Sequence, residues 1–157
     1  MKSLIVYSSQ TENTKKLADV IYDTLDGEKE IFQVDQDPSL EGYDQIFIGF
    51  WFQAGKPDPK TLGFLEQVKD SKVFLFATHG AAKGSDHVKN AVNTARELLK
   101  DVDVTGVFTC QGEVNPKVLE KVKQKPEPPV WINDAADAVG HPNQEDFTAL
   151  KQALTQL

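Results

Sequence analysis

The chain has 157 residues and a formal net charge of −7, with the acidic residues spread along it. This charge argues against nucleic acid or an anionic membrane as a partner and favours proteins with basic docking surfaces. The apolar runs are far shorter than the roughly 20 residues that cross a bilayer, and the N-terminal run is too short for a signal peptide. The lone cysteine, Cys110, excludes an internal disulfide and agrees with a reducing compartment. We therefore expect one cytoplasmic domain over residues 1–157, with no membrane contact.

Apolar runs typical of strands alternate with amphipathic runs along most of the chain. The runs that predict strands lie at residues 4–7, 30–34, 45–50, 72–77 and 103–110. Apolar residues recur at helical spacing within residues 17–25, 60–69, 88–99 and 143–157. Since β-α-β connections are right-handed, this order predicts an α/β fold. The expected architecture is a doubly wound, five-stranded parallel sheet with helices on both faces.

Two segments depart from a minimal pattern of this kind. Residues 51–59 contain two prolines and one glycine, which predicts a loop. Residues 111–141 are long for a connection between a last strand and a last helix. Within them, residues 115–122 predict a short basic helix, and a proline-rich stretch follows at 126–129.

A polar turn connects the first predicted strand to the first predicted helix. It comprises Ser9, Gln10, Thr11, Glu12, Asn13 and Thr14. A helix N-terminus offers unpaired N–H groups and partial positive charge to an anion, and the short side chains add donors. The turn lacks glycine and a following Gly-Lys-Ser/Thr pattern, so a single monophosphate fits it better than a nucleoside triphosphate. The alternative is that Thr11 only caps the helix.

Two further groups of residues follow the third and fourth predicted strands. One is aromatic, with Phe50, Trp51 and Phe52, and the other is Thr78-His79-Gly80. In an open parallel sheet, both groups emerge beside the first turn, where ligands usually bind. Aromatic side chains next to a phosphate site predict a planar heterocycle held by stacking. The alternative for these aromatics, and for Phe50 above all, is packing in the core.

Taken together, the first turn, the aromatic segment after Gly49 and the Thr78-His79-Gly80 segment resemble the flavodoxin family. The resemblance covers the whole chain and implies a strand order of 2-1-3-4-5, with non-covalently bound FMN. It implies phosphate contacts from Ser9, Gln10, Thr11, Asn13 and Thr14, ring contacts from Phe50, Trp51 and Phe52, and polar contacts to the ring edge from Thr78, His79 and Gly80.

The chain departs from the flavodoxin pattern at two positions. Glu12 stands where flavodoxins usually have glycine, and its carboxylate would repel a phosphate unless it points to solvent. The segment after the fourth strand lacks the tyrosine that commonly stacks on the flavin, and His79 is a candidate replacement. A binding module without flavin therefore remains an alternative.

The resemblance implies a monomeric carrier that takes electrons from a flavoprotein reductase and passes them to a partner protein. One alternative is an FMN-dependent NAD(P)H:quinone reductase, although Lys56 and Lys83 are only single candidates for an NADPH phosphate. Another is an accessory flavodoxin of a larger reductase, for example a bilirubin-reducing enzyme, because residues 110–113 resemble a subgroup of short flavodoxin-like proteins. We expect Cys110 to be an inert buried thiol. The three histidines lack the spacing of a metal site.

Overall fold

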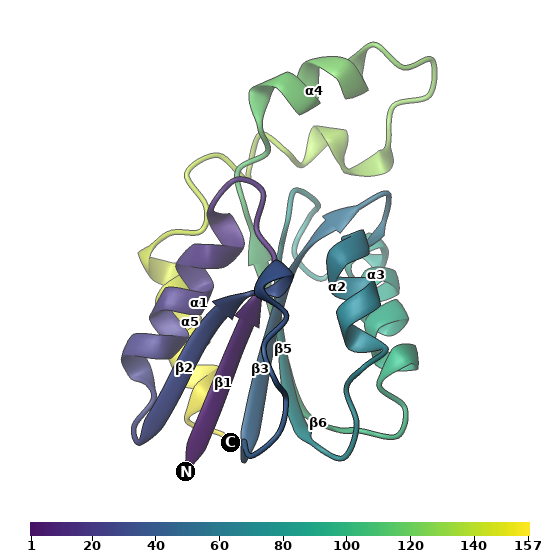
Figure 1. The fold of residues 1–157 in the computed structure, drawn as a ribbon. Coiled ribbons are helices and arrows are strands. Elements are labelled where there is room, and N and C mark those ends of the chain that lie inside the picture. The colour runs from purple at the N-terminus through teal and green to yellow at the C-terminus, as the bar shows by residue number, and fades with distance from the viewer.

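The centre of the molecule is a parallel sheet with strands in the order β2-β1-β3-β5-β6 (Figure 1). The computed structural model describes the backbone of residues 1–157 and every side chain except that of Val130. The parallel strands are β1 (Lys2–Tyr7), β2 (Glu28–Gln33), β3 (Gln45–Gln53), β5 (Lys72–His79) and β6 (Asp103–Gln111). Counting these strands along the chain gives the order 2-1-3-4-5, so the predicted fold and order are confirmed.

Helices cover both faces of this sheet. On one face lie α1 (Asn13–Thr24) and α5 (Gln144–Leu154), and on the other lie α2 (Pro59–Leu65) and α3 (Asp86–Leu98) (Figure 1). Alternate residues of β1 face opposite layers: Ile5 packs with α1 and α5, whereas Leu4 packs with α2 and α3. Burial on both faces explains why the central strands are continuous apolar runs. No helix among the described residues is long and apolar enough to cross a membrane.

The long connection between β6 and α5 contains the predicted basic helix. This helix, α4, spans Pro116–Lys123 and is capped at its N-terminus by Asn115, whose side chain accepts a hydrogen bond from the Lys117 N–H at 2.9 Å. A short 3-10 helix, η2 (Val130–Asn133), packs against it. Both lie beyond the carboxyl ends of the strands (Figure 1). Another short helix, η1 (Val34–Gln36), follows β2.

The expected loop at residues 51–59 is wrong. β3 continues through Gln53, because Trp51 pairs with Thr78 of β5, and the chain then turns back into a short antiparallel strand, β4 (Lys56–Pro57). Ala54 and Gly55 both have positive φ, which makes this tight turn possible. Similarly, β5 extends to His79, two residues further than predicted. Both extensions carry site residues on rigid strands rather than on loops.

Candidate functional site

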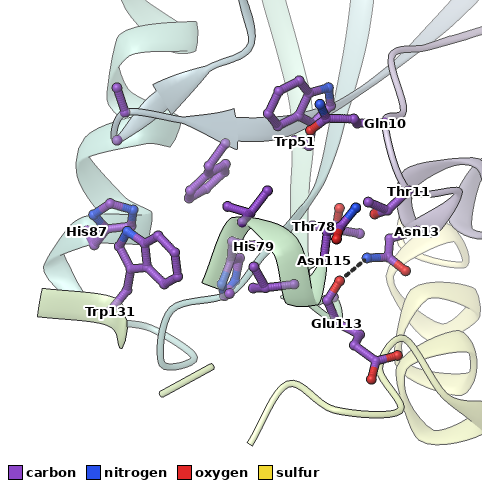
Figure 2. A pocket seen from close by; sticks show the side chains of 17 residues that line it. Gln10, Thr11, Asn13, Trp51, Thr78, His79, His87, Glu113, Asn115 and Trp131 are labelled. Atoms are coloured by element: carbon purple, nitrogen blue, oxygen red, sulfur yellow. Dashed lines mark hydrogen bonds between the residues drawn. The ribbon is translucent and has the colours of Figure 1, made fainter. Parts of the chain in front are cut away.

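A pocket opens at the carboxyl edge of the sheet, where the first turn and the ends of β3, β5 and β6 meet (Figure 2). Eight of the twelve expected site residues line this pocket, namely Gln10, Thr11, Asn13, Trp51, Phe52, Thr78, His79 and Gly80. Figure 2 places the first-turn residues at one end and His87 with Trp131 at the other. The pocket therefore has a polar end and an aromatic end.

The polar end is formed by the turn that leads into α1. Glu12 occupies the N-cap position with φ 69° and ψ −4°, and its side chain is exposed and makes no capping hydrogen bond. The alternative in which Thr11 caps α1 is therefore wrong. Gln10 and Thr11 are exposed at the pocket. Ser9 lies just outside the lining, and its Oγ accepts a long 3.4 Å hydrogen bond from the Lys15 N–H.

Two expected phosphate ligands make internal hydrogen bonds instead of facing the pocket freely. Thr14 is 1% exposed and does not line the pocket, and its Oγ1 lies 2.9 Å from the Thr78 Oγ1 and 3.4 Å from the Phe50 carbonyl oxygen. Asn13 lines the pocket, but its Nδ2 donates to the Glu113 carbonyl at 2.9 Å (Figure 2). Thr14 thus joins α1 to the sheet, and Asn13 joins α1 to the segment after β6.

A buried carboxylate, absent from the sequence prediction, holds the first turn against β3. Asp58 is 1% exposed and accepts hydrogen bonds from the Ser8 Oγ at 2.8 Å and the Thr61 Oγ1 at 2.8 Å. It also accepts from the backbone N–H groups of Thr61 at 3.2 Å and Trp51 at 3.5 Å. It caps α2, with Pro59 at the first helical position. The Asp58-Pro59 pair is the sequence signal that could have identified this cap.

Aromatic rings form the other end of the pocket. The Phe52 ring lies between two imidazoles, with centroids 5.3 Å from His79 and 5.9 Å from His87. Trp51 and Phe52 are half-buried and line the pocket. Phe50 is fully buried in the core beneath Phe52, so the expectation that it flanks a ligand ring is wrong. Phe50 and Phe52 point to the same face of β3, but Phe50 lies two residues further from the strand end, within the core cluster that α2 and α3 cover.

His79 is held as a neutral imidazole. Its Nδ1 lies 3.1 Å from the Ala81 carbonyl oxygen, and because a carbonyl can only accept, Nδ1 carries the proton. The pKa of His79 is lowered to about 4, mainly by burial; the hydrogen bond to Ala81 opposes this shift, and the nearby His87 adds to it. Nε2 is buried and has no hydrogen-bond partner among the described atoms. His79 therefore presents a single unprotonated nitrogen, which can accept but not donate.

The segment after β6 forms a wall that the sequence analysis did not assign to the site. Val114, Asn115, Val118 and Trp131 line the pocket from this side, as do Gly112 and Glu113. Its two ends are joined because the Glu113 N–H donates to the His141 carbonyl at 2.8 Å. Since Trp131 is one of only two tryptophans, its presence in an overlong connection was a usable signal.

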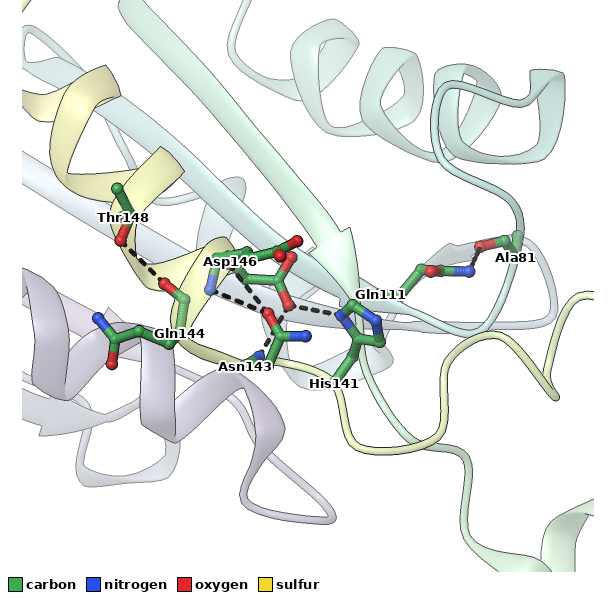
Figure 3. A network of polar contacts seen from close by, with 8 residues as sticks. Ala81, Gln111, His141, Asn143, Gln144, Asp146 and Thr148 are labelled. Atoms are coloured by element: carbon green, nitrogen blue, oxygen red, sulfur yellow. Dashed lines mark hydrogen bonds and ion pairs between the residues drawn. The ribbon is translucent and has the colours of Figure 1, made fainter.

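Both ends of this segment are anchored to regular elements. At the β6 end, the Gln111 Nε2 donates to the Ala81 carbonyl at 3.1 Å. At the α5 end, His141 Nδ1 lies 2.6 Å from the Asp146 carboxylate, which also accepts from the Asn143 N–H (Figure 3). Close packing adds to this, because a Cβ on Gly80 would lie only 2.5 Å from the Val114 side chain. The wall therefore has a defined position over the strand ends.

The pocket is built for binding and orientation more than for proton transfer. His79 is neutral over the physiological range because of its low pKa. Cys110 is buried, which raises the pKa of its thiol and keeps it protonated, as the sequence analysis expected. An anion would meet the α1 N-terminus and the neutral donors of Gln10 and Thr11. A planar ring would meet aromatic surfaces.

Comparison with known proteins agrees with this architecture. A flavodoxin-domain family model matches residues 4–155. The chain is 32% identical over 159 residues to the flavodoxin-like domain-containing protein BilS of Clostridioides difficile, covering 94% of this chain and 90% of that protein.

Two solved structures show the same fold at lower identity. A short-chain flavodoxin associated with a non-canonical PDU bacterial microcompartment has a TM-score of 0.69 and 12% identity, covering 100% of this chain and 96% of the other. A flavoprotein of Lactobacillus acidophilus, solved in complex with FMN, has a TM-score of 0.57 and 24% identity, covering 69% of this chain and 92% of the other. The chain belongs to the family of flavodoxin-domain proteins.

Proposed function

We propose that this protein binds FMN in the pocket and carries electrons between a flavoprotein reductase and a second protein. The observation that carries the proposal is the two-ended pocket, which sets a helix N-terminus with neutral donors opposite aromatic walls. These are the surfaces that a phosphate and a planar ring require. The FMN complex of the Lactobacillus acidophilus flavoprotein supports the choice of cofactor.

The residues at the polar end suit the phosphate of FMN. α1 is twelve residues long, so its macrodipole is well developed, and its first N–H groups face the turn. Thr11 and Gln10 can donate from the pocket lining. Glu12 is exposed, which allows its carboxylate to stay in solvent. We assign phosphate contacts to Gln10, Thr11 and the turn backbone, with Ser9 close by and Asn13 and Thr14 holding the turn in place.

The residues at the aromatic end suit the ring. Phe52 and Trp131 offer aromatic surface there, Trp51 adds more along the lining, and Gly80 leaves the backbone accessible where a larger residue would clash with Val114. The unprotonated Nε2 of His79 can accept a hydrogen bond from a ligand N–H or O–H group but cannot donate one. FMN, when bound, supplies the one- and two-electron chemistry, and the chain positions it and limits access to it.

We favour a carrier over a quinone reductase because of what lines the pocket. The described lining residues include no lysine or arginine, so an NADPH phosphate would find no cation there. Residues between 112 and 131 also wall one side of the pocket, which leaves less room for a second small substrate beside a bound ring. The similarity to the flavodoxin-like domain-containing protein BilS over nearly the whole chain supports a flavodoxin-type function.

The test uses protein reconstituted with FMN. NADH alone, with a quinone such as menadione, should leave the flavin absorbance unbleached and give little quinone reduction. Addition of a purified NADPH-dependent flavodoxin reductase with NADPH should bleach the flavin, and apo-protein is the control. Rapid, saturable quinone reduction with NADH and no second protein would favour the enzyme over the carrier.

A further inference from the structure

A basic surface lies above the pocket of this acidic protein. Lys117, Lys121, Lys123 and Lys125 are all exposed, and together with Val118 we call them the α4 face. Four lysines and one glutamate give residues 116–125 a formal charge of +3. Because the net charge of the whole chain is −7, the remaining residues together carry a charge of −10. The positive charge is therefore concentrated on one element while most of the molecule is acidic.

The α4 face has a fixed orientation relative to the pocket. Val122 is buried beneath α4, and Val118 lines the pocket while remaining 39% exposed. At 100° per residue, Lys117 and Lys121 fall on the side of the helix next to Val118, and Lys125 follows just after the end of α4. Figure 1 shows α4 as the outermost element beyond the carboxyl ends of the strands. Any protein that approaches the pocket from this side meets these lysines.

The lysines are available for a partner. Ion pairs among the described side chains join Lys15 to Asp19, Lys60 to Asp35 and His141 to Asp146, and none involves the α4 face. The rest of the chain thus gives these four cations no direct partner.

Exposed apolar residues point to the same segment. The large hydrophobic side chains that are exposed in the described chain are Met1, Val118, Val139 and Leu157. The first and last are chain ends, so both internal ones belong to residues 112–141. An exposed apolar residue among unpaired charges is the usual composition of a polar, reversible docking surface.

We infer that the α4 face is the docking surface for an acidic partner protein, whose carboxylates contact the lysines around an apolar contact with Val118. The inference rests on the proposed function, because it names the partner surface for electron exchange at the same pocket. The local positive charge of the α4 face then sets the docking orientation and selects an acidic partner. The net charge of the chain alone predicts a basic partner. Docking there places the partner over the pocket instead of elsewhere on the acidic body.

The test measures binding with two defined probes, an acidic [2Fe–2S] ferredoxin and the basic protein cytochrome c. Calorimetric titrations at about 20 mM ionic strength, where charges are weakly screened, should detect binding of the ferredoxin to the protein. Replacing Lys117, Lys121 and Lys125 with glutamine should weaken this binding by about tenfold, since each exposed ion pair contributes modestly. Raising ionic strength to about 0.5 M should weaken it in the unmodified protein by a similar factor.

A matched triple variant controls for the loss of net positive charge. Lys69, Lys72 and Lys100 are exposed at the opposite edge of the sheet, and replacing them with glutamine should leave ferredoxin binding unchanged. Equal weakening by both triple variants would overturn the inference, as would cytochrome c binding that outcompetes ferredoxin at the α4 face.

The same titrations are repeated with apo-protein, and FMN content is read separately from its absorbance. Ferredoxin binding that depends on the α4 lysines in protein that takes up no FMN would refute the cofactor proposal and leave the docking surface standing. FMN uptake without lysine-dependent binding would refute the docking surface alone.

Discussion

Glu12 has a backbone conformation that is unfavourable for a residue with a side chain. It adopts φ 69° at the N-cap of α1, a left-handed conformation that costs a non-glycine residue roughly 1–2 kcal/mol. From the sequence alone, Glu12 stands out only as a negative charge beside a phosphate site. The structure adds a backbone reason for glycine here, because the turn must bend sharply to direct the N–H groups of α1 towards the pocket.

Two substitutions at Glu12 separate charge from backbone strain. Glu12→Gly should raise the free energy of unfolding by about 0.5–1 kcal/mol and also tighten FMN binding, since it relieves both strain and repulsion. Glu12→Ala removes the charge but keeps the Cβ, so it should tighten FMN binding without the gain in stability. Urea unfolding and FMN titration measure the two effects. Equal stability changes for the two variants would show that strain at Glu12 is negligible.

At the scale of elements, Asp58 couples the first turn, β3 and α2. Its carboxylate accepts from Ser8, Trp51 and Thr61 while nearly fully buried. Asp58→Asn replaces an acceptor by a donor facing these donors, so we expect a loss of about 1–3 kcal/mol in the free energy of unfolding. Asp35→Asn is the control, because Asp35 pairs with Lys60 on the surface and its loss should cost little. Similar effects of the two changes in urea unfolding would contradict the role of Asp58.

The regular elements were predictable, but their ends at the site were not. The buried strands and α3 can be predicted because the spacing of their apolar residues is visible in the local sequence. The extension of β3 depends on Trp51 pairing with β5 and on Phe52 pairing with β4, and the β4 hairpin needs positive φ at Ala54. Such pairing is decided by tertiary contacts. The same holds for Thr14, whose hydroxyl bonds to Thr78 because the fold places the two side by side.

At the scale of the whole molecule, His79 links stability to pH. Its pKa falls from an ordinary value near 6.5 to about 4 on folding, mainly because of burial. Above pH 6.5 the imidazole is neutral in both states and contributes nothing to pH dependence. As pH falls from about 6.5 to 4, the unfolded chain binds the proton first, so about 3 kcal/mol of stability should be lost. A His79→Gln variant should lack this part of the slope in urea unfolding measured across that window.

The same pH dependence of the free energy of unfolding in the unmodified protein and in His79→Gln would contradict burial of a neutral His79. The position of His79 at the end of a strand follows from the sequence, but its burial depends on Phe52 and on the segment after β6. That segment is also why the site was only partly predictable. The first turn and the aromatic strand follow the flavodoxin pattern, whereas Trp131 and Val118 reach the pocket through an excursion of about thirty residues whose path local sequence does not specify.

The most direct test of the central claim is an FMN titration of the apo-protein followed by tryptophan emission. The chain has two tryptophans, Trp51 and Trp131, and both line the pocket. Trp51→Phe and Trp131→Phe each leave one reporter, so we expect FMN to quench the remaining emission in both variants with one-to-one stoichiometry. Unchanged emission in both variants, with no FMN retained by the unmodified protein, would show that this pocket does not bind the flavin.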